Sequence, residues 1–400
     1  MLPLSGLRIL DLSRLLPGPF ATLVLADLGA EVIKVEDPRG GDPLRALPPF
    51  APGGGDSVAF QALNRNKRSL ALDLRAPAGR QAFLRLCDRA DAVVESFRPG
   101  VLARLGLGWD VLHRRCPRLV LCSITGHGQT GPRSGSAGHD LDYLALSGVL
   151  ALSGPTQAPV PPAVQVADLA GGSWPAVAGI LAALMGRAAG GEGVHVDVSM
   201  TEGSLALLAP HLATAAARGR PLARGREPLL GGTACYGVYR TQDGRFVALG
   251  ALEPKFFAGF CAAVGRPELA ERQWEVDGAG PRDELERIFA GRTFEAWSRF
   301  AAEHDVCLAP VLEGDEPRRD PQLAARGAFL EQEAGAGATI AAVATPVRIV
   351  GAAHPNRPAP RLNEQGSEVL VEAGFTEDEV AALQAGGVLG PSRGGPAEGP

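Results

Sequence analysis

The chain has 400 residues, of which 46% are hydrophobic and 21% charged, so it can bury sizeable cores and is not a disordered protein. At about 100–200 residues per domain, this length predicts two or three domains. The formal net charge of −5 argues against a protein that coats nucleic acid, because that function needs a clustered basic face.

The N-terminal segment 1–17 carries Arg8, Asp11 and Arg14 within its apolar pattern, which is unlike a signal peptide. The longest uncharged runs, 143–167 and 169–186, are long enough to cross a membrane, but prolines and glycines interrupt both. We therefore expect buried segments of a soluble protein and no membrane partner. The cysteines form no CxxC pair, which is typical of the reduced thiols of a cytoplasmic protein; they stand at positions 87, 116, 122, 235, 261 and 307.

Strand and helix patterns alternate over the first 125 residues. Helices are expected at 20–28 and 77–89, and the short apolar runs that predict strands are 7–12, 32–35, 69–74, 92–95 and 119–124. Strands separated by helices indicate βαβ units, so we predict an α/β fold with a parallel sheet. Another strand is expected at 194–198, within a helical region.

The composition and residue pattern of the sequence change after residue 217. Residues 218–228 are basic and rich in helix breakers, which favours a linker. Beyond it, two strand-like runs flank the Gln242–Gly244 turn, a hairpin signature that opens a smaller domain at 229–325. Residues 326–385 follow and include a helix at 376–385, and the tail 386–400 is expected to be disordered.

Residues 126–131 match GxGxxG and follow a strand. A dinucleotide site should also open a helix and meet an acidic residue about 20 positions later. Here Pro132 follows directly, and positions 146–160 contain no acidic residue. The motif is better interpreted as a backbone turn.

A basic run at 64–68, with Arg75 beyond it, has two interpretations. Such a run is usually a solvated face. At the rim of an α/β sheet, near Arg98 and Arg104 in sequence, it could instead hold phosphate groups. The residues alone do not decide between these alternatives.

His139 lies in a glycine-flanked loop beside Asp140 and Asp142. A metal site is one interpretation, although no further His or Cys lies at ligand spacing. His195 and Asp197 alternate on a strand, as solvent-facing residues would. What remains is an acid–base set, made of His139, Asp168 and Glu253.

Several motifs in a fixed order resemble one family. They are PGP at 17–19, LADLGAEVIK at 25–34, NKRS at 66–69 with LDL at 72–74, FRPG at 97–100, GxGQTGP at 126–132 and PRL at 360–362. Together they resemble the family III CoA-transferase superfamily (CaiB/BaiF type) and, within it, the α-methylacyl-CoA racemases. The resemblance implies a Rossmann-like large domain built from both chain ends (1–217 and 326–385), a smaller α+β domain, and an interlocked homodimer.

The resemblance also implies roles for the acid–base set. Transferases of this family use an aspartate at the position of Asp168 as a nucleophile that forms an aspartyl-CoA intermediate. Racemases keep this aspartate as an acid or base and add a histidine in a GHD motif and a glutamate before proline, which this sequence has at His139 and Glu253. We therefore expect a racemase of 2-methylacyl-CoA thioesters, with a CoA-transferase as the alternative.

The resemblance further implies an acyl-CoA substrate and no cofactor beyond its CoA moiety. Asp37 stands where many relatives carry an arginine that contacts CoA, and Arg39 is a candidate replacement. The expected CoA contacts are Leu72, Asp73, Leu74, Arg75, Ser96, Phe97, Arg98, Arg104, Gly138, Asp140, Leu141, Asp142 and Tyr143.

Overall fold

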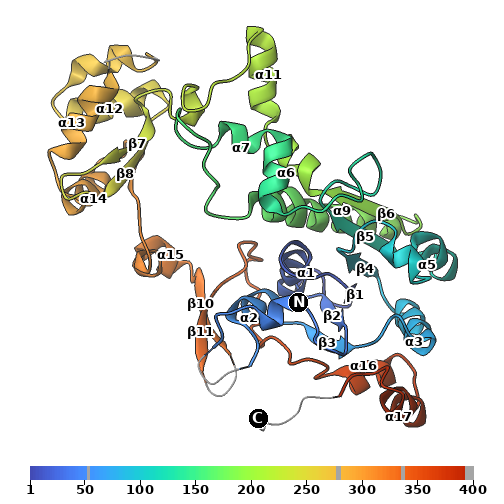
Figure 1. Ribbon diagram of the computed structural model, residues 1–400. Helices are drawn as coiled ribbons and strands as arrows, with labels where there is room; N and C mark the ends of the chain where they lie inside the picture. The colour runs from blue at the N-terminus through green and yellow to red at the C-terminus, as the bar shows by residue number, and fades with distance from the viewer. Residues whose placement is uncertain (52–54, 276–280, 335–337, 392–400) are drawn as a thin grey trace. The chain divides into compact units, whose positions relative to one another are not determined.

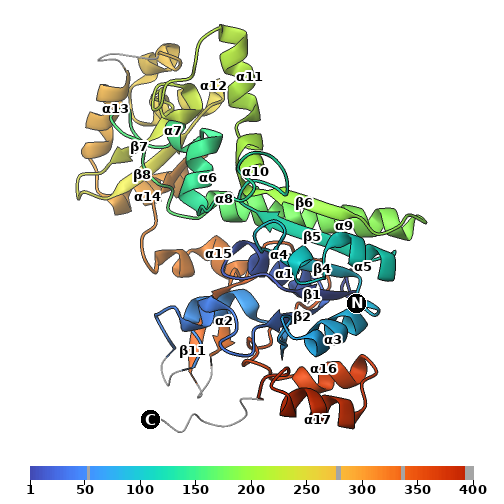
Figure 2. The same ribbon diagram turned by 45° about the vertical axis from the view of Figure 1, so that its right-hand side comes forward.

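The computed structural model describes residues 1–51, 55–275, 281–334 and 338–391, which form two compact units (Figure 1, Figure 2). Unit 1 contains Met1–Ser147, Gln165–Leu207 and the chain from Gln322 onward. Unit 2 contains Gly148–Val164 and Leu208–Pro321.

Unit 1 is built on a six-stranded sheet. Its strands are β1 (Arg8–Asp11), β2 (Glu31–Glu36), β3 (Arg68–Ala71), β4 (Ala92–Glu95), β5 (Val120–Thr125) and β6 (His195–Ser199). They follow the order β3-β2-β1-β4-β5-β6, and every neighbouring pair is parallel. The predicted parallel sheet of an α/β fold is thereby confirmed, in the strand order of a doubly wound dinucleotide-binding fold.

Helix α1 (Pro17–Asp27) shows how local sequence sets these elements. It begins at Pro17, three residues before the expected start, because the fixed φ of proline suits the first helical position. It ends before Gly29, whose φ of +107° only glycine adopts readily. The other α-helices that unit 1 contains before Leu207 are α2 (Val58–Asn64), α3 (Pro77–Cys87), α4 (Val101–Arg104), α5 (Trp109–Arg115), α6 (Asp140–Ser147), α8 (Val166–Asp168), α9 (Trp174–Ala188) and α10 (Met200–Ala206). A 3₁₀ turn lies at Pro43–Ala46.

The two uncharged runs of the sequence have different structures. The first is divided between α6, α7 (Val149–Leu152) and the loop that follows, so it is not one helix. The second belongs to a continuous helical stretch, Val166–Ala188, which by length and composition alone could cross a membrane. In unit 1 its α9 portion packs against β5, β6 and α1, as a core helix does.

The C-terminal part of the chain returns to unit 1. After α15 (Pro321–Ala325), it forms the antiparallel hairpin β10 (Phe329–Glu333) and β11 (Thr339–Val343). Helices α16 (Gly366–Glu372) and α17 (Glu377–Ala385) then lie beside α3 and β3 in both views (Figure 1, Figure 2). A capping box at Thr376 begins α17.

The expectation of a disordered tail from residue 386 is wrong for its first six residues. Leu389 is buried, and its backbone pairs with Leu72 just beyond β3. The apolar side chain of Leu389 and the open edge of β3 explain why this segment is ordered. The rest of the predicted tail, 392–400, lies outside the described residues.

Unit 2 contains an antiparallel sheet of β7 (Tyr236–Arg240), β8 (Phe246–Gly250) and β9 (Leu308–Pro310). Strands β7 and β8 form the predicted hairpin. An aromatic core stacks Tyr239 on Phe289, with ring centroids 4.6 Å apart. The remaining helical elements are α11 (Ala209–Arg218), α12 (Pro254–Ala263), α13 (Pro281–Ala290) and α14 (Phe294–Glu303), with 3₁₀ turns at Pro228–Leu230, Pro267–Arg272 and Glu316–Arg319.

The domain boundaries differ from those expected. Unit 2 starts at Leu208 rather than 229, ends at Pro321 and includes Gly148–Val164, which was assigned to the large domain. Segment 218–228 is not a free linker, because the buried Glu227 carboxylate accepts hydrogen bonds from Arg218 at 2.5 Å and Arg220 at 3.2 Å. Arg224 also donates to the carbonyls of Ala151 and Pro155 at 2.7 and 2.8 Å. These contacts fold the segment onto unit 2.

Candidate active site

The strand order of unit 1 reverses between β1 and β4, and the loops after these strands meet there. The backbone N–H of Arg14, after β1, donates to Ser96 Oγ, after β4, at 3.1 Å. The Arg14 guanidinium lies 5.2 Å from the centroid of the Phe97 ring. Ligands of open α/β sheets bind beyond the carboxyl ends of the strands at such a reversal. The expected CoA contacts after β4 are therefore at the edge where a ligand is expected, and Arg14, which the sequence analysis did not select, lies beside them.

Cationic side chains at this edge differ in whether they are neutralised. Arg98 and Arg104 are exposed, and neither forms an ion pair within the described residues. Arg75 instead pairs with Asp73 at 3.0 Å and with Asp37 at 3.4 Å. The unpaired guanidinium groups of Arg98 and Arg104 suit phosphate groups.

Other residues near β3 that were expected to contact CoA already contact residues of the chain itself. The side chain of Leu72 is buried, and its backbone N–H donates to the Glu36 carbonyl at 2.8 Å. Leu74 is partly buried and packs against the core of unit 1. Arg39 pairs with Asp37 at 2.7 Å. A ligand here would meet the backbone of Leu72 rather than its side chain.

The basic run 64–68 is neither a solvated face nor a phosphate site. The guanidinium of Arg65 pairs with Asp27, and Lys67 Nζ lies 3.1 Å from Asp11 Oδ2. Arg68 pairs with acidic residues on β2 and α16. These internal partners neutralise the run, because an unpaired charge is costly to bury.

Lys67 belongs to a buried ionic network beneath the carboxyl ends of β1 and β2. Burial lowers the pKa of Lys67 to about 8, although Asp11 opposes this shift. Burial alone would raise the pKa of Asp11, but Lys67 and Lys34 hold it well below its usual range. The network consists of Asp11, Lys34, Glu36, Asp42, Arg45 and Lys67.

The GxGxxG motif positions a tyrosine. A Cβ atom on Gly126 would lie 2.4 Å from the Tyr143 ring, and one on Gly138 would lie 2.7 Å from it. The hydroxyl of Tyr143 donates to the Gly138 carbonyl at 2.5 Å. Gly128 and Gly131 have φ values of +81° and +90°. The interpretation as a backbone turn therefore fits the structure, and the turn docks onto α6.

The loop that carries His139 is connected to Asp168 through backbone hydrogen bonds. The Asp142 carboxylate accepts the backbone N–H of His139 at 2.9 Å, at the start of α6. The Asp140 carboxylate accepts the backbone N–H of Asp168 at 3.0 Å, at the end of α8. His139 itself is exposed and Leu141 is exposed beside it. Because Asp140 follows His139 directly in the chain, this hydrogen bond brings His139 and Asp168 close together. They are two of the three expected acid–base residues.

The environment of Asp168 favours its neutral form. Burial and the Asp140 carboxylate raise the pKa of Asp168 to about 6, and the nearby His139 imidazole opposes them in part. Tyr143 interacts with the same group of charges. Burial, Asp168 and Asp142 raise the pKa of Tyr143 to about 12, while Arg98 opposes the shift. The loop after β4 and the start of α6 therefore surround one group of titratable side chains.

A π-helical turn, Leu169–Ser173, connects α8 to α9 directly after Asp168. Such turns are frequent at functional sites, where they reposition a side chain within a helix. This turn packs closely on α10: a Cβ atom on Gly203 would lie 1.9 Å from the Gly171 carbonyl oxygen. Gly203 was not selected from the sequence, since a single glycine in a helix has no distinguishing pattern.

The Asp197 side chain is exposed, as expected, whereas the His195 ring is partly buried against its neighbours. The half-buried His195 ring places Nε2 2.9 Å from Ser123 Oγ and stacks on Trp109, with centroids 5.7 Å apart. Burial lowers the pKa of His195, and Asp197 opposes this shift. The Asp197 carboxylate accepts the backbone N–H of Gln129 at 3.0 Å. His195 thus connects β6 to β5 and α5, and Asp197 connects β6 to the loop that carries Gln129.

Glu253 lies in unit 2, at the N-terminus of α12. Its side chain is exposed and makes no ion pair within the described residues. Its interaction with His139 stays a prediction. No group of three or more His, Cys, Asp or Glu side chains that could hold a metal ion occurs in the part of the chain that the structure describes.

A histidine beside a carboxyl group whose pKa is about 6 can exchange protons near neutral pH. The model of CoA-transferase family III matches residues 4–366. The chain belongs to this family.

Known members of family III differ in the reaction they catalyse. The chain is 34% identical to human "Alpha-methylacyl-CoA racemase" over 390 residues, which cover 96% of this chain and 97% of that protein. It is 37% identical to "Succinate--glutarate CoA-transferase" of Agrobacterium fabrum, over 92% of this chain and 95% of that protein. A crystal structure of a CAIB/BAIF family protein from Brucella suis superposes with a TM-score of 0.80 and 30% identity, and covers 93% of this chain and 99% of that one. Membership in family III thus establishes the class of enzyme and leaves the reaction to be proposed.

Proposed function

We propose that this enzyme inverts the α-carbon of 2-methylacyl-CoA thioesters by 1,1-proton transfer. The observation that carries the proposal is the adjacency of His139 and Asp168, with burial and Asp140 raising the pKa of Asp168 to about 6. A carboxylate with this pKa is basic enough to accept a proton and, once protonated, acidic enough to return it near neutral pH. An ordinary aspartate would be a weaker base.

The reaction needs two proton-transferring groups on opposite faces of a planar intermediate. One group removes the α-proton, and the electron pair of the C–H bond moves into the thioester carbonyl to form an enolate. The second group then donates a proton to the other face. His139 serves one face and Asp168 the other, and Glu253 orients the imidazole and stabilises its charged form. Positioned groups of this kind typically contribute about 10²–10⁴-fold to the rate.

The CoA moiety would bind along the carboxyl edge of the sheet. Arg98 and Arg104 supply unpaired positive charge for its phosphates. Other contacts come from the backbone of Leu72–Arg75, from Ser96 and Phe97, and from the loop Gly138–Tyr143. Because this proton transfer is not a redox reaction, it needs no cofactor beyond CoA. An interlocked homodimer in the cytoplasm would supply Glu253 from the partner subunit.

A CoA-transferase acting through an aspartyl-CoA intermediate at Asp168 is the second candidate. The 37% identity to a succinate–glutarate CoA-transferase favours it. The charged segments 34–36 and 64–69 do not decide between the two reactions. Their Lys34, Glu36 and Lys67 side chains belong to the buried ionic network and are not available to substrate.

Incubation of one enantiomer of a 2-methylacyl-CoA in D₂O, without an acceptor acid, tests the proposal. A racemase incorporates deuterium at the α-carbon while the enantiomeric excess falls. Full α-protium with unchanged enantiomeric excess would refute the racemase. A transferase moves CoA to an added carboxylate and leaves a hydroxylamine-sensitive adduct on Asp168.

The variant His139→Ala separates the two reactions further. It should lose racemisation and spare anhydride formation at Asp168, since that step does not use the imidazole. His113→Ala is a matched control, because this histidine stacks on Trp109 of α5 rather than lying near Asp168. Loss of CoA transfer with retained racemisation in His139→Ala would favour the transferase.

A further inference from the structure

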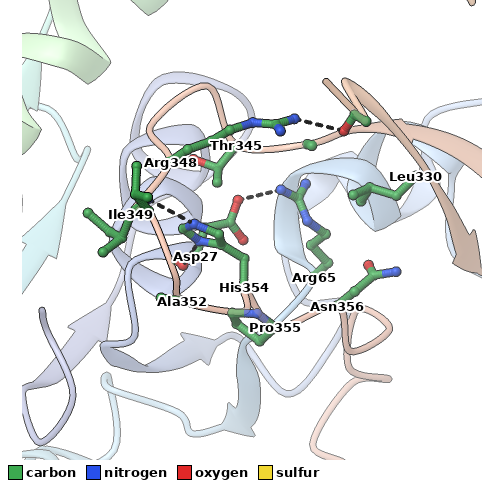
Figure 3. Close-up of a pocket in the computed structure, with 13 residues that line it drawn as sticks. Asp27, Arg65, Leu330, Thr345, Arg348, Ile349, Ala352, His354, Pro355 and Asn356 are labelled. Atoms are coloured by element: carbon green, nitrogen blue, oxygen red, sulfur yellow. Dashed lines mark hydrogen bonds and ion pairs between the residues drawn. The ribbon is translucent and has the colours of Figure 1, made fainter. Parts of the chain in front are cut away.

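A second pocket in unit 1, of about 390 Å³, lies away from the candidate active site. It is bounded by the end of α1 at Asp27, by Arg65 after α2, and by residues within 327–330 and 344–356. Helix α1 starts just after β1 and has eleven residues, so Asp27 lies about 15 Å from the catalytic edge along its axis. Figure 3 shows Thr345 and Arg348 on one side of the pocket and Asp27, Arg65 and His354 on the other.

Most charges in this pocket are already balanced. Asp27 pairs with Arg65, and the Asn66 amide donates to its carboxylate at 2.7 Å. His354 Nδ1 lies 2.8 Å from the Asp27 carbonyl, and its Nε2 accepts the backbone N–H of Ile349 at 3.3 Å. Since a carbonyl only accepts and an N–H only donates, these two contacts require the neutral imidazole with its proton on Nδ1.

Arg348 leaves the pocket with one unbalanced positive charge. Its guanidinium donates to the Gly327 carbonyl at 3.0 Å but meets no carboxylate among the described residues. Within the described residues, the chain's own contacts pair every lining charge except that of the exposed Arg348 guanidinium, which a monoanion would complement.

Two buried polar atoms of residues that line the pocket also have no partner. Arg65 Nε and Thr345 Oγ1 make no hydrogen bond within the described residues, and their side chains belong to residues only 3% and 7% exposed. Buried polar groups in native proteins are nearly always satisfied, so two unpaired groups at one pocket favour a ligand or an ordered water that bonds to them. Together with Arg348 they offer donors to the two oxygens of a carboxylate.

Apart from Gly327 and Asn356, whose amide donates to the Glu331 carbonyl at 3.1 Å, the remaining lining is aliphatic. Leu330, Ile349, Ala352 and Pro355 enclose the polar groups, as Figure 3 shows. The volume falls in the range of small-molecule sites and is far too small for a whole acyl-CoA. We infer that this pocket binds a small monocarboxylate with a short branched or linear aliphatic body.

Binding of 2-methylpropanoate to the full-length protein tests this inference by calorimetry and by the shift in melting temperature. The expected result is saturable binding that inorganic phosphate and the neutral 2-methylpropanamide do not reproduce at matched ionic strength. Arg348→Gln and the isosteric Thr345→Val should each weaken binding at least tenfold and leave basal activity unchanged. Arg348 is exposed, so its replacement should not impair folding.

Asp168→Asn separates this pocket from carboxylate binding at the candidate active site. Retained binding in that variant supports the inference, whatever reaction the enzyme catalyses. Loss of binding in Asp168→Asn, equal binding by Arg348→Gln, or equal binding of the amide would overturn it. So would a pocket filled by a second copy of the chain and closed to the carboxylate.

Discussion

The replacement Asp168→Asn should abolish racemisation and yet stabilise unit 1 at neutral pH. Burial and Asp140 raise the pKa of Asp168 from 3.8 to about 6. A carboxyl with a raised folded-state pKa stabilises the fold while it is protonated. That contribution is fully present below pH 3.8 and is lost as the pH rises through 6. The difference between the two pKa values corresponds to at most about 3 kcal/mol in the free energy of unfolding.

Asparagine keeps the shape of the protonated side chain and cannot ionise. It also retains the backbone N–H that donates to Asp140. The variant should therefore melt several degrees above the natural protein at about pH 8, and the difference should shrink toward zero as the pH falls to about 4.

Scanning calorimetry across this pH range measures the effect. Asp305→Asn is a matched control, because Asp305 is exposed in unit 2 and its replacement should change stability by less than about 0.5 kcal/mol. An equal or lower melting temperature for Asp168→Asn at pH 8, or an increase that does not depend on pH, would refute the reasoning.

Three further variants test the surroundings of the site. Gly203→Ala would place a Cβ atom 1.9 Å from a backbone oxygen, so it should destabilise the fold by about 1–3 kcal/mol or more in thermal melting, whereas Gly186→Ala on α9, with open space around it, should not. Lys67→Met removes the ion-pair partner of the buried Asp11 carboxylate and leaves it the hydrogen bonds of Ser13 and Thr22, so chemical denaturation should show a loss of about 3–5 kcal/mol. A neutral effect would contradict the buried ionic network. Asp140→Asn keeps a hydrogen-bond acceptor but removes the negative charge that raises the pKa of Asp168. The acidic limb of the pH–rate profile should therefore move to lower pH. An unmoved limb would contradict the assignment of this limb to Asp168.

The parallel sheet could be predicted because each strand is a short apolar run between turn signals. His139, Asp168 and Glu253 could be selected because the motifs around them resemble those of family III. The basic run at 64–68 was harder to interpret, since the partners of Lys67 and Arg68 stand at Asp11 and Glu372, far away in sequence. A charge pattern shows where charges are and not which residues neutralise them.

Long-range packing explains the remaining errors. The order of the tail depends on Leu389 pairing with Leu72, a contact across more than 300 residues. The assignment of 148–164 to unit 2 depends on contacts such as that of Arg224 with the Ala151 carbonyl. Local propensity does not encode either contact. The requirement for glycine at 203 likewise arises only when two helices meet.

The most direct test of the proposed mechanism is to measure α-proton exchange for each pure enantiomer of a 2-methylacyl-CoA in D₂O, with His139→Ala and Asp168→Asn. If the two groups serve opposite faces of the enolate, each variant loses racemisation but still exchanges the α-proton of one enantiomer, and the two variants act on opposite enantiomers. If both variants exchange the same enantiomer, or if either exchanges both equally, the two-face mechanism is contradicted.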